Sequence, residues 1–242
     1  MAPAVEFRVT RYDPAADEQP RLVSYEVEVA AADRVLDGLE YIKRRLDPSV
    51  AFRRSCAHGV CGSDALVING TVRLACKTLL QDLEPPLLVE PLATFPVIRD
   101  LVVDLTSFFE ATRRVRPWLE AGEPIPEREF LQTPAELTAF AEGTKCILCA
   151  SCVTACPVVK RGTPYIGPAA VVQGHRFVND SRDVGAEARL RILAAADGAG
   201  ACENFFECTK VCPRGILVTK RINEIKAMLQ AGGYVKGDAA DG

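Results

Sequence analysis

The chain has 242 residues and a formal net charge of −3, with 25% charged and 48% hydrophobic residues. This length and composition suit a globular protein with one large or two smaller cores. They give no support to nucleic-acid binding, which usually requires a strongly basic face. No stretch approaches the ~20 apolar residues of a membrane-spanning helix, and the N-terminal residues lack the apolar segment of a signal peptide. We therefore expect a protein on the cytoplasmic side of the membrane, without a nucleic-acid partner.

The first half of the chain predicts a small sheet with one helix packed across it. Hydrophobic and polar residues alternate in several short runs, which is typical of strands. A helical spacing of apolar residues follows over 35–46, with Asp33 as the expected N-cap. Asn69-Gly70 is a strong signal for the turn of a hairpin. Strands are expected at 5–9, at 25–29, on both sides of that turn within 65–75, and at 86–91.

The second half of the chain reads as helical. Asp104 is placed to cap a helix that ends before Pro117. The sequence "TPAE" at 133–136 combines a capping box with proline at the first helical position, which predicts another helix start. Thr219 is the expected cap of the last helix. Further helices are expected over 168–179, 185–196 and 219–230, and the long surface connection over 116–129.

The ten cysteines fall into three groups along the chain. In a reducing compartment they are not expected to form disulfides. Packing has no use for cysteine at fixed intervals, whereas metal binding does, because several thiolates must converge on one centre. The groups are Cys56, Cys61 and Cys76; Cys146, Cys149, Cys152 and Cys156; and Cys202, Cys208 and Cys212.

The first group resembles the C-x4-C-x2-C…C pattern of plant-type [2Fe-2S] ferredoxins, with Asp64 at the third ligand position. Glycines at 59 and 62 allow the positive φ angles of a loop that wraps a cluster. Cys56 and Cys61 would bind one iron, and Asp64 and Cys76 the other. A carboxylate is a reasonable hard ligand for ferric iron and donates less electron density than thiolate, so a changed potential is expected. The alternative is that Asp64 only caps the loop and water or an outside ligand completes the iron.

The second and third groups resemble the paired runs of bacterial ferredoxins. "CILCASCVTACP" (146–157) is a complete C-x2-C-x2-C-x3-C-P run, in which the fourth cysteine serves the other cluster. "CENFFECTKVCP" (202–213) has Phe205 where the second cysteine would stand. The resulting sets are Cys146, Cys149, Cys152 and Cys212 for a [4Fe-4S] cluster, and Cys156, Cys202 and Cys208 for a [3Fe-4S] cluster. Structural zinc is the alternative, but seven cysteines cannot make two four-cysteine zinc sites.

The chain has only two histidines, His58 and His175. A Rieske centre uses two histidines as ligands on one iron. His58 is interpreted instead as a solvent-facing loop residue, and His175 as a surface or core residue of a helix.

These three motifs, in this order, resemble the iron–sulfur subunit of succinate:quinone oxidoreductases, the succinate dehydrogenase and fumarate reductase group. The resemblance runs from about Val5 to Leu229 and includes "RLACKT", "YIGPAA", "RFVNDSRD" and "CTKVCPRGI". It implies an α+β fold, with a β-grasp plant-type [2Fe-2S] ferredoxin domain over 1–104. An all-α bacterial-type seven-iron ferredoxin domain follows over 105–242.

The resemblance also implies a function and partners. Single electrons would pass from the FAD of a flavoprotein subunit through [2Fe-2S], [4Fe-4S] and [3Fe-4S] to membrane quinone. The partners implied are that flavoprotein and membrane-anchor subunits, with or without haem. The chain would then be a peripheral membrane protein on the cytoplasmic face of the bacterial inner membrane. The equivalent subunit of a quinol:fumarate reductase is the alternative.

The expected quinone site departs from the family pattern. Relatives place Trp after the first Cys-Pro and His after the first cysteine of the second run, where this chain has Arg161 and Glu203. Only Pro157 matches, so the site is built differently, with menaquinone as one candidate, or lies mostly in the anchor. Lys160 and Arg161 are equally well interpreted as a basic pair facing solvent or lipid headgroups. Trp118 is expected in the core or an interface.

Overall fold

The computed structural model describes residues 4–30 and 32–234. It divides into two compact units. The first comprises Met1–Leu105 together with Ile147–Ala155, and the second comprises Thr106–Cys146 together with Cys156–Gly242. The division differs from a simple split near residue 104 in one respect, because most of the first four-cysteine run packs with the first unit.

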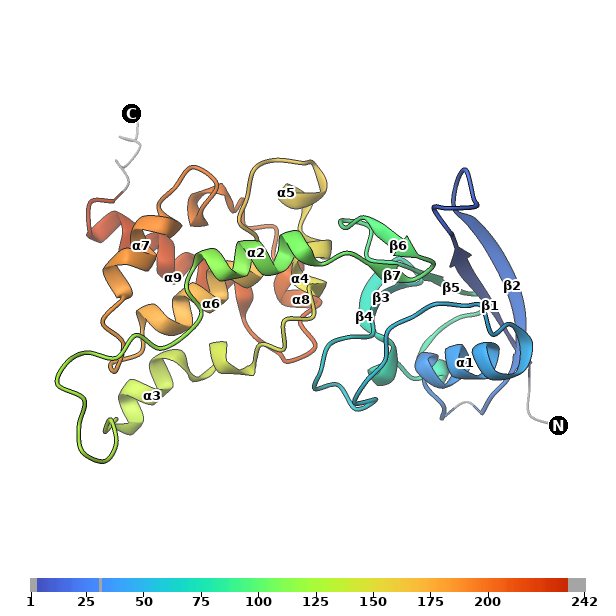
Figure 1. Ribbon diagram of the computed structural model, residues 1–242, viewed down its shortest axis with the longest axis horizontal. Coiled ribbons are helices and arrows are strands. Elements are labelled where there is room, and N and C mark those ends of the chain that lie inside the picture. Colours follow the sequence, from blue (N-terminus) through green and yellow to red (C-terminus); the bar gives the residue numbers. More distant parts are fainter. Residues whose placement is uncertain (1–3, 31, 235–242) are drawn as a thin grey trace. The chain divides into compact units, whose positions relative to one another are not determined.

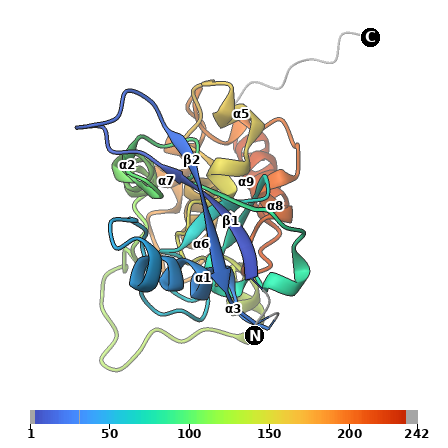
Figure 2. The ribbon, with the colours of Figure 1, turned by 90° about the vertical axis from the view of Figure 1, so that its right-hand side faces the viewer.

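The first unit contains a five-stranded mixed sheet with the strand order β2-β1-β5-β3-β4 (Figure 1). Its long strands β1 and β2 lie side by side in Figure 2 as well. The long strands β1 and β2 pair antiparallel, whereas β1 and β5 run parallel. Helix α1 follows β2 in the sequence and precedes β3, and a π-helical turn, Ile42–Leu46, continues it. This arrangement confirms the β-grasp expectation. The bounds are β1 Ala4–Arg11, β2 Arg21–Glu28, α1 Val35–Tyr41, β3 Ala65–Ile68, β4 Thr71–Leu74 and β5 Leu87–Glu90.

The core of this unit follows from the alternation in the sequence. Phe7 and Val9 of β1 are fully buried, as are Leu39 of α1 and Val89 of β5. The β3–β4 hairpin turns at Asn69-Gly70 as expected, with both residues in the left-handed region. Two shorter strands, β6 Val97–Arg99 and β7 Val102–Val103, form a second small sheet, and helix α4, Ser151–Ala155, also belongs to this unit.

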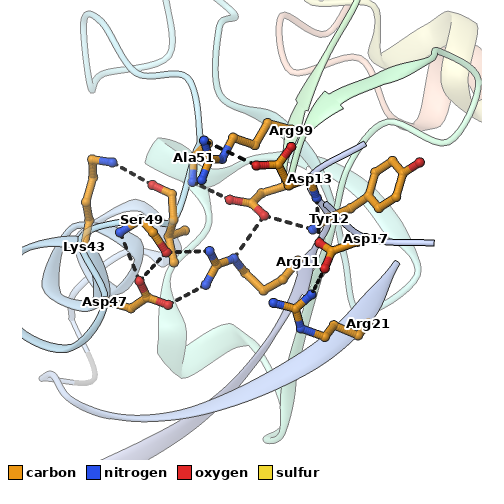
Figure 3. A network of polar contacts seen from close by, with 12 residues as sticks. Arg11, Tyr12, Asp13, Asp17, Arg21, Lys43, Asp47, Ser49, Ala51 and Arg99 are labelled. Carbon is orange, nitrogen blue, oxygen red and sulfur yellow. Dashed lines mark hydrogen bonds and ion pairs between the residues drawn. The ribbon is translucent and has the colours of Figure 1, made fainter. Parts of the chain in front are cut away.

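A buried arginine connects the sheet to the segment that leads into the first cysteine group (Figure 3). Arg11 of β1 is 7% exposed and donates to Asp100 at 3.0 Å and to Asp47 at 2.5 Å. Ser49 Oγ accepts a further bond from Arg11 at 2.8 Å. The hydrogen bond from the Ser49 hydroxyl, with help from Tyr25 and Arg11, holds the pKa of Asp47 below its ordinary value. This contribution to stability is present at neutral pH and is lost as the pH falls through the lowered pKa.

The second unit is helical, as expected. Helix α6 packs against α2, α3, α7 and α9. The helices are α2 Thr106–Arg114, α3 Pro134–Ala141, α5 Pro157–Lys160, α6 Pro168–Val178, α7 Ala186–Leu193, α8 Glu207–Lys210 and α9 Val218–Ala231. The capping box at Thr133 is confirmed: the Glu136 N–H donates to Thr133 Oγ1, and the Thr133 N–H donates to the Glu136 carboxylate. Trp118 is 49% exposed, so it is not a core residue.

Two expected helix caps are wrong. Helix α1 begins at Val35 after Arg34, and Asp33 instead accepts a hydrogen bond from the Ala30 N–H at 2.7 Å. Helix α9 begins at Val218, and the buried Thr219 hydroxyl lies 3.0 Å from Thr209 Oγ1. In both cases the side chain bonds to a group other than the N–H groups of its helix: the Ala30 N–H for Asp33 and the Thr209 hydroxyl for Thr219.

Candidate iron–sulfur sites

The first cysteine group lies in a loop that curls around the sulfur of Cys56. The N–H groups of His58, Val60 and Cys61 point at Cys56 Sγ, at 3.5, 3.4 and 3.3 Å. The sulfurs of Cys56 and Cys61 are 3.2 Å apart. Gly59 and Gly62 have positive φ in this loop, as expected. Ala57 also has positive φ, which could not be predicted because alanine rarely adopts this conformation.

The environment of the loop sets the protonation of its thiols. The three backbone N–H groups stabilise the Cys56 thiolate and lower the pKa of Cys56 to about 6. Cys76, presented just after β4, is 1% exposed. Burial, together with the neighbouring Asp64 carboxylate, raises the pKa of Cys76 to about 12. Because metal ligands must be deprotonated, iron binding here would release a proton from Cys76.

The two oxygens of the Asp64 carboxylate have different surroundings. Its side chain is 3% exposed, and Oδ2 accepts the N–H of Cys76 at 2.6 Å, so one oxygen does cap the loop. The other oxygen, Oδ1, is buried and has no hydrogen-bond partner. An unsatisfied buried carboxylate oxygen is costly, and coordination to iron would relieve that cost. The donor set therefore fits a two-iron cluster with Cys56, Cys61 and Cys76.

The two later cysteine runs adopt the same local backbone. Each first cysteine follows a single 3-10 turn, Gly143–Lys145 or Ala199–Ala201. The residues two and four positions after that cysteine are left-handed in both runs, and a helical turn, α4 or α8, then follows. The left-handed residues are Leu148 and Ala150 in the first run and Asn204 and Phe206 in the second. The second run thus has the same backbone conformation as the first, although Phe205 replaces its second cysteine.

The left-handed Phe206 is a feature that the sequence did not reveal. Its φ is 64°, and a bulky residue in this region costs roughly 1–2 kcal/mol. Such strain persists where the surrounding structure requires it, often at functional sites. Asn204, two residues earlier, adopts the left-handed conformation more easily. Its residue type is the feature of this run from which a left-handed residue could have been predicted.

The residues expected to form the third set line one cavity of the second unit. Cys156, Cys202 and Cys208 face it together with Phe205 and Pro157. They come from the residue before α5, the loop before α8, and α8 itself. Burial raises the pKa of Cys208, whose sulfur lies 3.4 Å from Thr219 Oγ1. Three thiols therefore line one cavity, with the Phe205 ring where a fourth thiol would stand, and such a set would suit a three-iron cluster.

The expected four-thiolate set draws on both units. Cys149 and Cys152 belong to the first unit, and Cys146 and Cys212 to the second. Within the first unit, Gly62 lies directly against Cys149: a Cβ at Gly62 would be 2.7 Å from Cys149 Cβ. A 3.0 Å contact between the hydroxyls of Thr94 and Thr154 also joins α4 to this unit.

No three His, Cys, Asp or Glu side chains of residues 4–30 and 32–234 are arranged to hold a single metal ion. In an iron–sulfur cluster the thiolates bind different irons, so donors to one cluster need not meet at one point. His58 is exposed, as expected for a loop residue. His175 is a core residue of α6 whose Nε2 lies 2.7 Å from Glu224, and burial lowers the pKa of His175.

The residues at the departures from the family pattern contact each other. Arg161 forms an ion pair with Glu203, and its guanidinium lies 5.4 Å from the centroid of the Phe205 ring. Both charged side chains are about half exposed, at 49% and 48%. The guanidinium and the carboxylate thus pair with each other at the surface beside the third cysteine set.

Comparisons with known proteins agree with this interpretation. A family model described as a 2Fe-2S iron-sulfur cluster binding domain matches residues 6–110, and one described as a 4Fe-4S dicluster domain matches residues 142–216. The fumarate reductase iron-sulfur subunit of Mycobacterium tuberculosis is 46% identical over 219 residues, 89% of each chain. The succinate dehydrogenase iron-sulfur subunit of Coxiella burnetii is 37% identical over 228 residues, 93% of this chain and 97% of the relative.

A solved structure gives the same answer for the fold. The chain matches one from the Mycobacterium smegmatis Sdh1 complex in the apo form with a TM-score of 0.89 and 28% identity, covering 98% of this chain and 100% of that one. Among the described residues, no helix has both the length and the apolar character needed to cross a bilayer. From these similarities over most of its length, the chain belongs to the family of iron–sulfur subunits of succinate dehydrogenase and fumarate reductase.

Proposed function

We propose that this chain carries single electrons between the flavoprotein and the membrane quinone of a succinate:quinone oxidoreductase. The observation that supports it most directly is the contact between Gly62 and Cys149. It places the loop of the first cysteine group against the first four-cysteine run, and this proximity favours electron transfer between the clusters that the two segments would hold. The clusters supply one-electron transfer, and the residues of the chain space, insulate and tune them.

The cluster assignments follow the donor sets. Cys56, Cys61, Asp64 and Cys76 would hold [2Fe-2S], and Cys156, Cys202 and Cys208 would hold [3Fe-4S]. Cys146, Cys149, Cys152 and Cys212 would hold [4Fe-4S]. Paramagnetic resonance of the oxidised and the dithionite-reduced protein, with iron analysis, tests all three together. The absence of any one signal would contradict the relay.

The partners belong to the same proposal. A flavoprotein subunit with FAD would deliver electrons, and a membrane anchor would hold the chain on the cytoplasmic face of the bacterial inner membrane. Quinone would accept electrons near Pro157, which lines the cavity of the third cysteine set. The Arg161–Glu203 pair stands beside that cavity in place of the aromatic and imidazole groups of relatives, so the quinone contacts differ here.

Fumarate reduction is the second candidate, favoured by the 46% identity to a fumarate reductase subunit. The direction depends on the quinone potential and the flavoprotein. Comparing succinate oxidation with fumarate reduction by the purified complex, with ubiquinone and menaquinone analogues, separates the two.

Asp64→Cys is expected to retain the first cluster with a lower midpoint potential, because thiolate donates more electron density than carboxylate to the same iron. A redox titration followed by paramagnetic resonance measures the shift. Asp64→Asn is the control, since it keeps a side-chain oxygen for the Cys76 N–H but weakens the ligand. Loss of the [2Fe-2S] signal in the cysteine variant would count against ligation at this position.

Phe205→Cys is expected to convert the three-iron centre into a four-iron one, because it adds the missing thiolate to a backbone that already has the four-iron conformation. Iron content should rise by one atom per chain, and the signal of the oxidised three-iron cluster should disappear. Phe205→Leu is the control and should change neither. Unchanged iron content in the cysteine variant would show that residue 205 does not face the open corner of the cluster.

A further inference from the structure

A basic groove lies on the first unit, and no cysteine lines it. It has a volume of about 260 Å³ and is lined by Glu40, Lys43, Arg44, Phe52 and Arg54. Its two walls come from different parts of the chain: the end of α1 with its π-helical turn, and the segment before the first cysteine group. Three cations against one carboxylate stand out in a chain whose net charge is −3.

The arginines of this groove are held in place from one side. Glu40 binds Arg44 at 2.8 Å and Arg54 at 2.5 Å, so one carboxylate fixes two guanidinium groups. Each guanidinium has five N–H donors in a planar fork, and the side chains remain 68% and 45% exposed. Most of their donors therefore stay available to a second carboxylate.

Lys43 is fixed in a different way. Its ammonium donates to the carbonyl oxygens of Pro48 and Val50, at 3.2 and 2.6 Å. This leaves its charge at the groove while tying it to the backbone. Cations in the last turn of a helix also interact favourably with the helix dipole. That explanation does not cover Arg54, which comes from another segment and completes the groove.

One wall of the groove is close in sequence to the first cysteine group, which indicates what kind of partner the groove would bind. Arg54 lies two residues before Cys56, the first residue of the expected [2Fe-2S] site. A partner bound at the groove would thus be held beside the centre where electrons are expected to enter. Phe52 adds an aromatic surface to the cationic one, which suits a peptide segment better than a free anion.

We propose that this basic groove binds an acidic segment of the flavoprotein subunit, with a carboxylate of that subunit bridging Arg44 and Arg54. This rests on the proposed function and extends it by naming the surface that selects the partner. Bidentate guanidinium–carboxylate pairs give geometric specificity as well as attraction. Complementary charge also speeds the encounter of two proteins and makes it sensitive to salt.

The test compares two charge reversals in the purified complex. Arg44→Glu places a carboxylate in the groove. Arg191→Glu is the matched control, because Arg191 also pairs with a glutamate four residues earlier and is 71% exposed, but lies on α7 of the other unit. Gel filtration over a series of KCl concentrations measures how much flavin stays with the iron–sulfur chain.

For Arg44→Glu, the affinity for the flavoprotein near 0.15 M salt should fall by roughly tenfold, and its dependence on salt should become shallower. Arg191→Glu should behave as the unchanged complex does. Equal retention in all three, or equal loss in both variants, would overturn the proposal. If Arg44→Glu loses its cluster signals, Arg44→Gln replaces it, with a smaller loss of affinity expected and no loss overturning the proposal.

The controls separate this proposal from the broader one. If the unchanged chain shows no cluster signals or purifies without a flavoprotein, the proposed function itself is wrong. If its clusters and flavoprotein are present and only the charge reversal has no effect, the relay stands and the assigned groove is wrong.

Discussion

Gly62→Ala is expected to slow electron transfer from the first to the second cluster while both clusters still assemble. A Cβ at this position would lie 2.7 Å from Cys149 Cβ, 3.0 Å from Cys149 Cα and 3.1 Å from the Ile147 carbonyl oxygen. Two of these three neighbours are backbone atoms, so a rotamer change cannot relieve the overlap. The loops must separate instead, and electron tunnelling falls exponentially with distance. A small separation of the two loops should therefore slow this transfer a few-fold without abolishing it.

The control for this change is Gly70→Ala. Gly70 has a φ of +74°, close to the +70° of Gly62, but no heavy atom lies within 4 Å of the place where its Cβ would stand. Both substitutions therefore carry the same left-handed backbone cost, roughly 1–2 kcal/mol, and only Gly62→Ala adds the overlap. Freeze-quench paramagnetic resonance would follow reduction of the second cluster. Equal rates in the two variants would show that the contact does not limit electron flow.

Arg189→Met is expected to destabilise the second unit severely. Arg189 is fully buried and forms an ion pair with the equally buried Asp183 at 2.5 Å. Its guanidinium also donates to the carbonyl oxygens of Val115, Arg116 and Trp118, at 2.8 to 3.1 Å. Methionine fills a similar volume but leaves a buried carboxylate without its cation. Removing one partner of such a pair costs about 3–5 kcal/mol.

The loss should be visible in thermal unfolding of the complex. At this chain length a destabilisation of that size lowers the melting temperature by about 10 °C. Arg191→Met on the same helix is the control, since Arg191 is 71% exposed and its pair with Glu187 is at the surface. Little change is expected there. A melting temperature for Arg189→Met within the range of that control would mean that the 115–120 connection is held by other contacts.

Much of the candidate site could be predicted from the sequence, because iron–sulfur clusters are bound by particular residue types at characteristic spacings. The two runs, the missing cysteine at Phe205 and the unusual Asp64 are all visible in the chain. The β-grasp sheet could also be predicted, since the alternation of hydrophobic and polar residues and the Asn69-Gly70 turn are local features of the sequence. The family relationship then follows from motifs in a fixed order.

The two wrong caps are residues whose side chains bond to groups outside the helix that they were expected to cap. Asp33 and Thr219 have the residue types of helix caps, yet their side chains bond to Ala30 and Thr209. At the start of α9 the N–H of Leu217 is bound by Glu142, which comes from the end of α3. A cap forms only where a backbone N–H lacks a better partner, and that depends on which distant side chain is near.

The residue types and their spacing by themselves determined which clusters to expect and which side chains would hold them. Only the tertiary structure decided that Asp64 keeps one oxygen unpaired, that Phe206 is left-handed, and that Gly62 touches Cys149. The physical reason is that spacing along a chain records which donors are available to a metal. Burial, backbone strain and close approach arise only when segments far apart in sequence pack together.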